Sequence, residues 1–166
     1  MTSGVDHRNI IKFISEPTDE NFQLFIRGHL YLEALLSEII ERTYKEPKAL
    51  TDLAAMFYRK VKLVRATGRI SKTLENLLLE INKVRNKLAH KLEFTLSFND
   101  AFQLALKAHA AGIDFSDDTI YQNKKHSKEW YGIYGVVNEV MCNTFSHLIW
   151  ENEDIFSKED IGRFLG

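Results

Sequence analysis

Apolar residues recur at spacings of three and four along most of the 166-residue chain, which is the period of an amphipathic α-helix. This pattern predicts five substantial helices and no convincing pair of strands. Only Pro17 and Pro47 interrupt the chain, and this scarcity of breakers suits long helices better than many short strands. We therefore predict an all-α fold, an antiparallel helical bundle of about five helices within a single domain over 1–166.

The expected helix boundaries come from capping residues at the ends of the periodic segments. In chain order the long helices are expected over 18–44, 51–68, 72–91, 99–111 and 127–150. Asp19, Ser71 and Ser127 are good N-cap types, and Gly68 and Gly112 are typical of C-terminal caps. The aromatic residues of the last long helix, among them Trp130, Tyr134 and Phe145, are expected in the core.

Four shorter segments complete the prediction. A short apolar helix is expected over 5–14, ahead of Pro17, and a polar loop near 113–127, where no periodic apolar face exists. Residues 94–98 alternate as a strand would, but a lone strand has no partner, so they are expected to connect two helices. Ser157 and Asp160 resemble a capping box for a short C-terminal helix near 157–165.

Composition narrows the class of protein. The single cysteine, Cys142, excludes an internal disulfide and is expected to be a small apolar residue in a helix core. The first residues contain no apolar stretch long enough for a signal peptide or a membrane span, so a cytoplasmic protein is expected. The formal net charge of −1 argues against a stable nucleic-acid-binding role, but it leaves a nuclease with local, brief contacts possible.

The helix expected over 72–91 carries the residues of greatest chemical interest. Projected at 100° per residue, most of its apolar residues gather on one side, which must face the core. These are Leu74, Leu77, Leu78, Ile81, Val84, Leu88 and Leu92. Arg85 lies at the edge of that side, while Asn86 and His90, four residues apart, share the opposite face with Leu79. A leucine beside a polar pair at the surface is consistent with a partner-binding surface.

Arg85, Asn86 and His90 suit metal-free cleavage of RNA, with no cofactor. Histidine can remove the proton of a ribose 2′-hydroxyl or protonate a leaving 5′-oxygen near neutral pH. Arginine remains charged and matches phosphate oxygens, and Asn86 can orient the imidazole or donate to phosphate. One chain supplies one such histidine, so a homodimer would provide both an acid and a base.

The segment RNKLAH (85–90) resembles the signature of the HEPN superfamily, which is Arg, a polar residue often Asn, three variable residues and His. An Arg-Asn pair followed by His at this spacing is expected only about 0.02 times by chance in such a chain. The segments RGHLYLEALLSEIIE, KVKLVRATGRIS and INKVRNKLAHKLEF are similar to the mannitol-repressor-like branch, over roughly residues 20–95. The resemblance implies a helical bundle, a dimer and a cleft formed by two motifs. It makes Arg85 the phosphate-binding residue and His90 the acid–base group.

Two alternatives remain at the level of the sequence. The resemblance favours an endoribonuclease, as a toxin or phage-defence effector, or else a non-catalytic regulator or interaction module of the mannitol-repressor type. HEPN toxins that a nucleotidyltransferase antitoxin modifies carry Tyr two residues after the His, where this chain has Leu92. That mode of neutralisation is therefore not expected, and a different antitoxin or regulatory protein is a possible partner.

Other polar residues carry weaker hypotheses. His29 and Glu33 share a helix face, and a hydrogen-bonded pair behind the cleft is expected there rather than a metal site. Lys124, Lys125 and Lys128 form a small basic group beside Trp130, which is expected to be a solvated loop.

Overall fold

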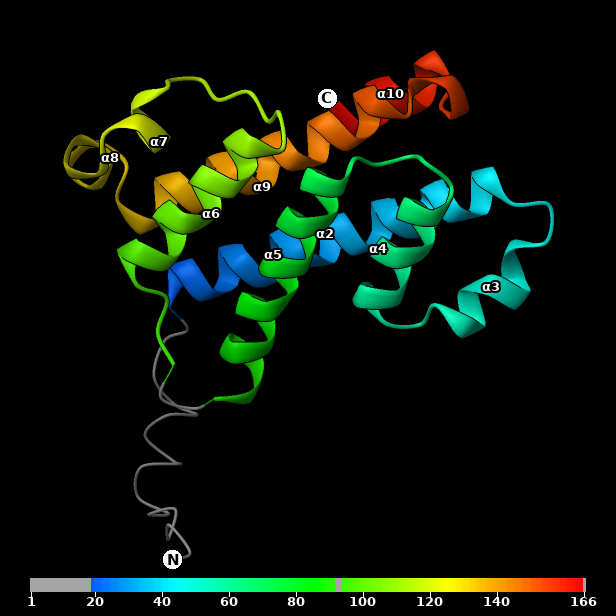
Figure 1. Cartoon of the computed structure of the whole chain (residues 1–166), viewed down its shortest axis with the longest axis horizontal. Coiled ribbons are helices and arrows are strands. Elements are labelled where there is room, and N and C mark those ends of the chain that lie inside the picture. The colour runs from blue at the N-terminus through cyan, green and yellow to red at the C-terminus, as the bar shows by residue number, and fades with distance from the viewer. Residues whose placement is uncertain (1–18, 92–93, 166) are drawn as a thin grey trace, which may run out of the picture.

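The computed structural model of the chain describes residues 19–91 and 94–165. Within these ranges it forms nine α-helices, one 3-10 turn and no strand, so the predicted all-α fold class is confirmed (Figure 1). The helix predicted over 5–14 lies outside the described residues. The elements are α2 (Glu20–Thr43), α3 (Pro47–Leu53), α4 (Phe57–Ala66), α5 (Lys72–His90), α6 (Phe98–Ala110), α7 (Thr119–Gln122), α8 (Lys124–Trp130), α9 (Gly132–Glu151), the 3-10 turn (Glu153–Ile155) and α10 (Lys158–Leu165).

Capping residues fix several of these ends as predicted. Asp19 accepts a hydrogen bond from the Asn21 amide at the start of α2, and Ser71 accepts one from Leu74 at the start of α5. Ser157 and Asp160 form the reciprocal bonds of a capping box at α10. Helix α6 begins slightly before the expected residue, because Ser97 forms a second capping box.

The prediction of one helix over 51–68 was wrong, since the structure has α3 and α4 there. Pro47 occupies the first turn of α3, where its missing N–H removes no helical hydrogen bond. The chain leaves the helical conformation again before Phe57, whose ring is buried at the start of α4.

The polar loop predicted near 113–127 was wrong in its second half, which forms α7 and α8. Ile120 is fully buried and anchors this segment, and its carbonyl accepts a hydrogen bond from the Ser127 hydroxyl at 2.8 Å. A segment with one apolar anchor has no periodic face that would reveal it. The last long helix begins at Gly132, not at Ser127, because Gly132 has a positive φ of 60°.

Helices α2 and α9 form the centre of the molecule and run in the same direction (Figure 1). Gly28 of α2 lies against Met141 of α9, and three residues farther on the Tyr31 ring packs edge-on against Phe145. A Cβ atom at position 28 would lie 2.7 Å from the Met141 Cγ, so glycine permits this close approach. By contrast, α4 and α5 form an antiparallel pair, so the chain directions are mixed.

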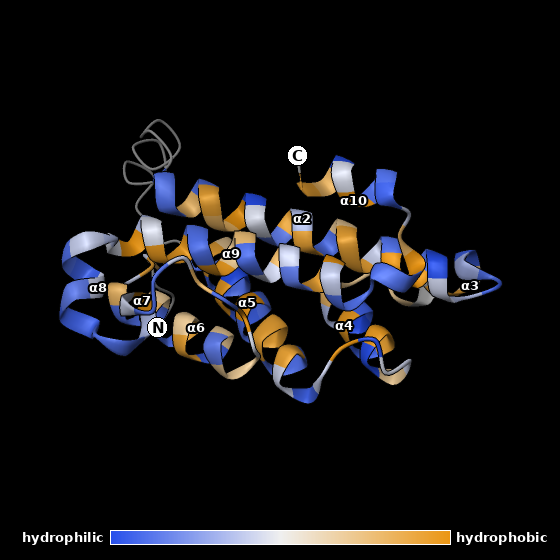
Figure 2. Cartoon of the chain, turned by 90° about the horizontal axis from the view of Figure 1, so that it is seen from above, coloured by the Kyte–Doolittle hydropathy of each residue, from blue (hydrophilic) through white to orange (hydrophobic). Residues whose placement is uncertain are grey.

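Apolar side chains from five long helices meet in one core, and Figure 2 shows the corresponding orange stripes along α2, α5 and α9. The largest fully buried side chains are Phe25, Leu32, Leu36, Ile39, Ile70, Leu74, Leu77, Leu78, Ile81, Leu104, Ile120 and Leu148. The expectation that the late aromatic residues belong to this core was wrong for Trp130 and Tyr134, which are 61% and 50% exposed. Cys142 also lies at the surface of α9 instead of in the core.

Candidate functional site

Helix α5 positions all three predicted site residues near its C-terminal end. This end extends past the other helices at the lower edge of Figure 1. Arg85 is half-buried, whereas Asn86 and His90 are exposed, and His90 is the last residue of the helix. The guanidinium of Arg85 donates a hydrogen bond of 3.1 Å to the side-chain oxygen of Asn86. Two of the three residues are therefore in direct contact.

Arg85 and His90 do not meet within one chain. Five residues of α-helix correspond to a rotation of about 140°, so the two side chains leave α5 in different directions. A shallow hollow of about 440 Å³ lies on the side of His90, and Arg85 is not among the residues that line it. The residues lining this hollow, called the α5 hollow below, are Tyr58, Leu79, Asn82, Lys83, Asn86, Lys87, His90 and Lys91.

A buried histidine supports the α5 hollow from behind. His29 of α2 is 2% exposed, and its Nε2 lies 3.2 Å from the Oδ1 of Asn82. Its ring also packs against the Phe57 ring, tilted by 30° with 4.2 Å between ring centroids. Burial lowers the pKa of His29, against the smaller raising effect of the Asn82 hydrogen bond. A neutral His29 that donates from Nε2 directs the Asn82 oxygen inward and leaves the Asn82 amide N–H groups to donate into the hollow.

The expected pairing of His29 with Glu33 was wrong. Glu33 instead forms an ion pair of 2.9 Å with Lys60, and the partner of His29 comes from α5, 53 residues away in the sequence. In the ranges that the structure describes, no group of three or more His, Cys, Asp or Glu side chains could hold a metal ion.

The surface around the α5 hollow is strongly basic, although the whole chain is not. Residues 57–91 contain ten Lys and Arg but only two acidic residues, Glu75 and Glu80. Buried Glu75 is bound by Lys62 and Lys72, and Glu80 by Lys83 and Lys107. The sequence interpretation missed this concentration because it averaged charge over the whole chain, where acidic residues elsewhere compensate.

Three cations around His90 on α5 lack acidic partners within the residues that the structure describes. Arg85, Lys87 and Lys91 form no ion pair with any carboxylate among residues 19–91 and 94–165. The Lys87 ammonium instead lies over the Phe94 ring, 5.5 Å from its centroid. Cations without a carboxylate partner in the described part of the chain favour the approach of an anionic ligand to this end of α5.

The other predicted polar group lies on a separate part of the surface. Lys124, Lys125 and Lys128 belong to α8, where the His126 ring stacks in parallel on Trp130 with 4.9 Å between centroids. Lys124 also donates a hydrogen bond of 2.6 Å to Asn99 at the start of α6. This group is therefore part of a short helix and not of the expected loop.

Comparison of the chain with family models, with curated proteins and with solved structures gave no match. Within the described part of the chain, no helix is both long enough and apolar enough to span a bilayer. Chemically, the α5 hollow combines an imidazole, amide donors and ammonium groups. Such a set can bind a phosphate group and move a proton beside it.

Proposed function

We propose that this protein is a metal-independent endoribonuclease of the HEPN type that acts as a homodimer. The observation that carries the proposal is the meeting of Asn82, Asn86 and His90 in one hollow, within a segment of ten basic and two acidic residues. The resemblance of residues 85–90 to the HEPN signature supplies the reaction class. Asn82 is an addition to the residues expected from the sequence.

In the proposed reaction, a neutral His90 accepts the proton of a ribose 2′-hydroxyl. The 2′-oxygen then attacks the adjacent phosphorus, the bond from phosphorus to the 5′-oxygen breaks, and a protonated His90 from the second copy donates a proton to that oxygen. The products are a 2′,3′-cyclic phosphate and a free 5′-hydroxyl. Arg85 and the amides of Asn82 and Asn86 stabilise the charge on the phosphate oxygens.

Two features support a homodimer with this hollow at its interface. The reaction uses one histidine as base and another as acid, and each copy provides one at this site. Two apolar side chains also line the hollow, Leu79 and Tyr58, and Tyr58 is 51% exposed. Contiguous apolar patches at a protein surface are typical of sites that a partner covers. In such a dimer the Arg85 of one copy is available to the hollow of the other.

We place this activity in a toxin or a phage-defence effector, whose RNA cleavage an antitoxin or regulatory protein holds in check. The second candidate is a non-catalytic regulator or interaction module. It is favoured by the two apolar side chains in the hollow, since Tyr58 and Leu79 would bind a protein partner without any need for His90.

Two substitutions separate these functions when RNA cleavage in EDTA and oligomeric state are measured together. The nuclease predicts that His90→Ala abolishes cleavage in a protein that remains dimeric, and that Tyr58→Asp weakens both dimer and cleavage. His109→Ala, at an exposed histidine of α6, is the matched control and should retain full activity. A native protein that cuts no RNA, together with loss of partner binding in Tyr58→Asp alone, would support the regulator instead.

A further inference from the structure

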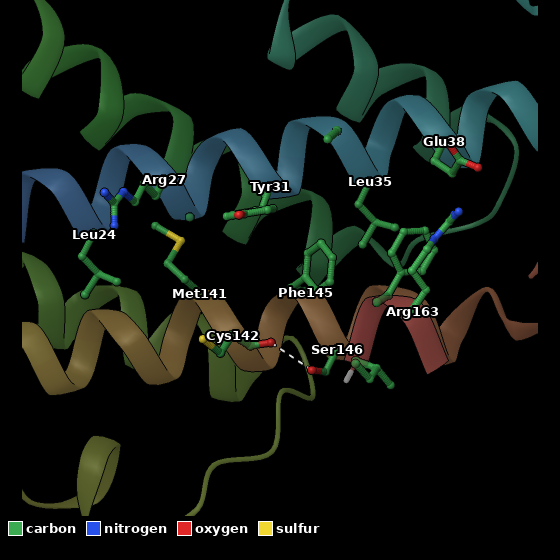
Figure 3. Close-up of a pocket in the computed structure, with 14 residues that line it drawn as sticks. Leu24, Arg27, Tyr31, Leu35, Glu38, Met141, Cys142, Phe145, Ser146 and Arg163 are labelled. Atoms are coloured by element: carbon green, nitrogen blue, oxygen red, sulfur yellow. Dashed lines mark hydrogen bonds between the residues drawn. The ribbon is translucent and has the colours of Figure 1, made fainter. Parts of the chain in front are cut away.

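An apolar groove lies on the face of α2 that points away from the α5 hollow. Its volume is about 660 Å³, and residues of α2, α9 and α10 line it (Figure 3). Tyr31 lines the groove, whereas His29 faces α5, because two residues of helix turn the side chain by about 200°. The groove is therefore separate from the proposed catalytic surface.

The floor and one end of the groove are apolar and well supported. Gly28 and Met141 form the floor where α2 and α9 touch, and the Phe145 ring packs edge-on against Tyr31 and against Phe164 of α10. Helix α10 is held in place by an ion pair of 2.8 Å between Arg42 and Asp160. A volume of this size is typical of sites for small molecules.

The few polar side chains of the groove differ in how they are paired. Glu38 is bound by Arg42, Arg163 lies 3.3 Å from Asp160, and the Ser146 hydroxyl donates to the Cys142 carbonyl. Arg27 is the exception: among the described residues, no hydrogen bond or ion pair to it is found. Figure 3 shows Arg27 near Leu24 toward one end of the groove and Arg163 toward the other, with Tyr31 and Phe145 between them.

We infer that this groove binds the hydrocarbon chain of a fatty-acid-like carboxylate, with its head group on Arg27. An apolar groove lined by α2, α9 and α10 fits a single flexible chain. The Arg27 guanidinium, for which no partner is found among the described residues, can bind a carboxylate with two parallel hydrogen bonds. The inference does not depend on the proposed nuclease activity, because no residue lines both the groove and the α5 hollow.

Cys142 gives a direct measure of occupancy, since it lines the groove and is the only cysteine of the chain. The rate at which a neutral maleimide modifies Cys142 is followed while decanoate is added below its micelle concentration. We expect saturable protection by decanoate and weaker protection by decanol, which has the same chain without the charge. Arg27→Gln should weaken decanoate binding roughly tenfold or more and remove its advantage over decanol. Lys125→Gln, at an exposed cation of α8, should bind as the native protein does.

Three results would overturn the inference. The first is an unchanged rate with decanoate in a protein whose circular dichroism is native. The second is protection by decanol that equals protection by decanoate, or protection of Arg27→Gln by decanoate that equals protection of the native protein. The third is protection of Cys142 from maleimide in the absence of any added ligand, if this protection disappears when the protein is diluted. That result would mean that a second copy of the protein covers the groove.

Discussion

The imidazole of His29 and the side-chain amide of Asn82, which come from two crossing helices, lie 3.2 Å apart. His29 is buried and Asn82 is half-buried at the edge of the α5 hollow, so the pair connects the core to the proposed site. The bond fixes which end of the Asn82 amide is exposed. This relationship gives the first two predictions.

Asn82→Asp should impair RNA cleavage more than Asn82→Ala does. The aspartate can still accept the hydrogen bond from His29, but it presents a negative oxygen to the phosphate where the amide presented a donor. A hydrogen bond to a charged partner contributes about 1.5–3 kcal/mol, so kcat/KM should fall roughly tenfold to a hundredfold. Asn76→Ala, at an exposed position on the same helix, is the control. Native kcat/KM in Asn82→Asp would show that the amide does not contact substrate.

The stability of the protein should decrease as the pH falls below the ordinary pKa of histidine, about 6.5. Burial lowers the pKa of His29 in the folded state, so the unfolded chain binds protons more readily in that range. Urea unfolding at a series of pH values should therefore show that the free energy of unfolding falls more steeply with decreasing pH in the native protein than in His29→Gln. Titration of the His29 ring by NMR provides the direct check, and a midpoint at or above 6.5 would contradict the prediction.

Gly28→Ala should lower the free energy of unfolding by about 1 kcal/mol. The added Cβ would lie 2.7 Å from Met141 Cγ and 3.0 Å from its Cβ, and such overpacking costs about 1–3 kcal/mol. Alanine recovers up to about 1 kcal/mol through its better helix propensity. Gly162→Ala in α10 is the matched control, since its Cβ would meet nothing within 4 Å and the variant should be slightly more stable. Equal effects in urea unfolding would mean that α2 and α9 do not touch at Gly28.

Lys87 and Lys91 should contribute more to RNA affinity than lysines that already have acidic partners. In the inactive His90→Ala background, the further change of both to Gln should weaken RNA binding several-fold. It should also reduce the slope of log affinity against log salt by about two. Lys72→Gln is the control, because Lys72 forms an ion pair of 2.8 Å with Glu75. An unchanged salt dependence in the double variant would place RNA on another surface.

The sequence predicted α5 well, because its apolar period is regular and Ser71 caps it. It did not predict the division into α3 and α4, although Pro47 has the helix-starting role that proline often has. Helices α7 and α8 are short and depend on the single buried Ile120, so tertiary packing determines them more than local pattern does.

In the candidate site, too, the sequence predicted what depends on neighbouring residues and missed what depends on contacts between distant ones. Arg85, Asn86 and His90 are close in sequence, and their spacing on a helix was enough to place Asn86 and His90 on one face. The contact between His29 and Asn82 joins residues 53 positions apart, and nothing in one sequence indicates it. The local excess of basic residues over 57–91 was visible in the sequence, but the chain-wide charge concealed it.

The most direct test of the proposed function is end-group analysis after the native protein is incubated with a mixed RNA pool in EDTA, beside His90→Ala. The proposal predicts fragments with 2′,3′-cyclic phosphate and 5′-hydroxyl ends from the native protein, and intact RNA with His90→Ala. Fragments that carry 5′-phosphate ends, equal cleavage by both proteins, or intact RNA with a folded, dimeric native protein would contradict it.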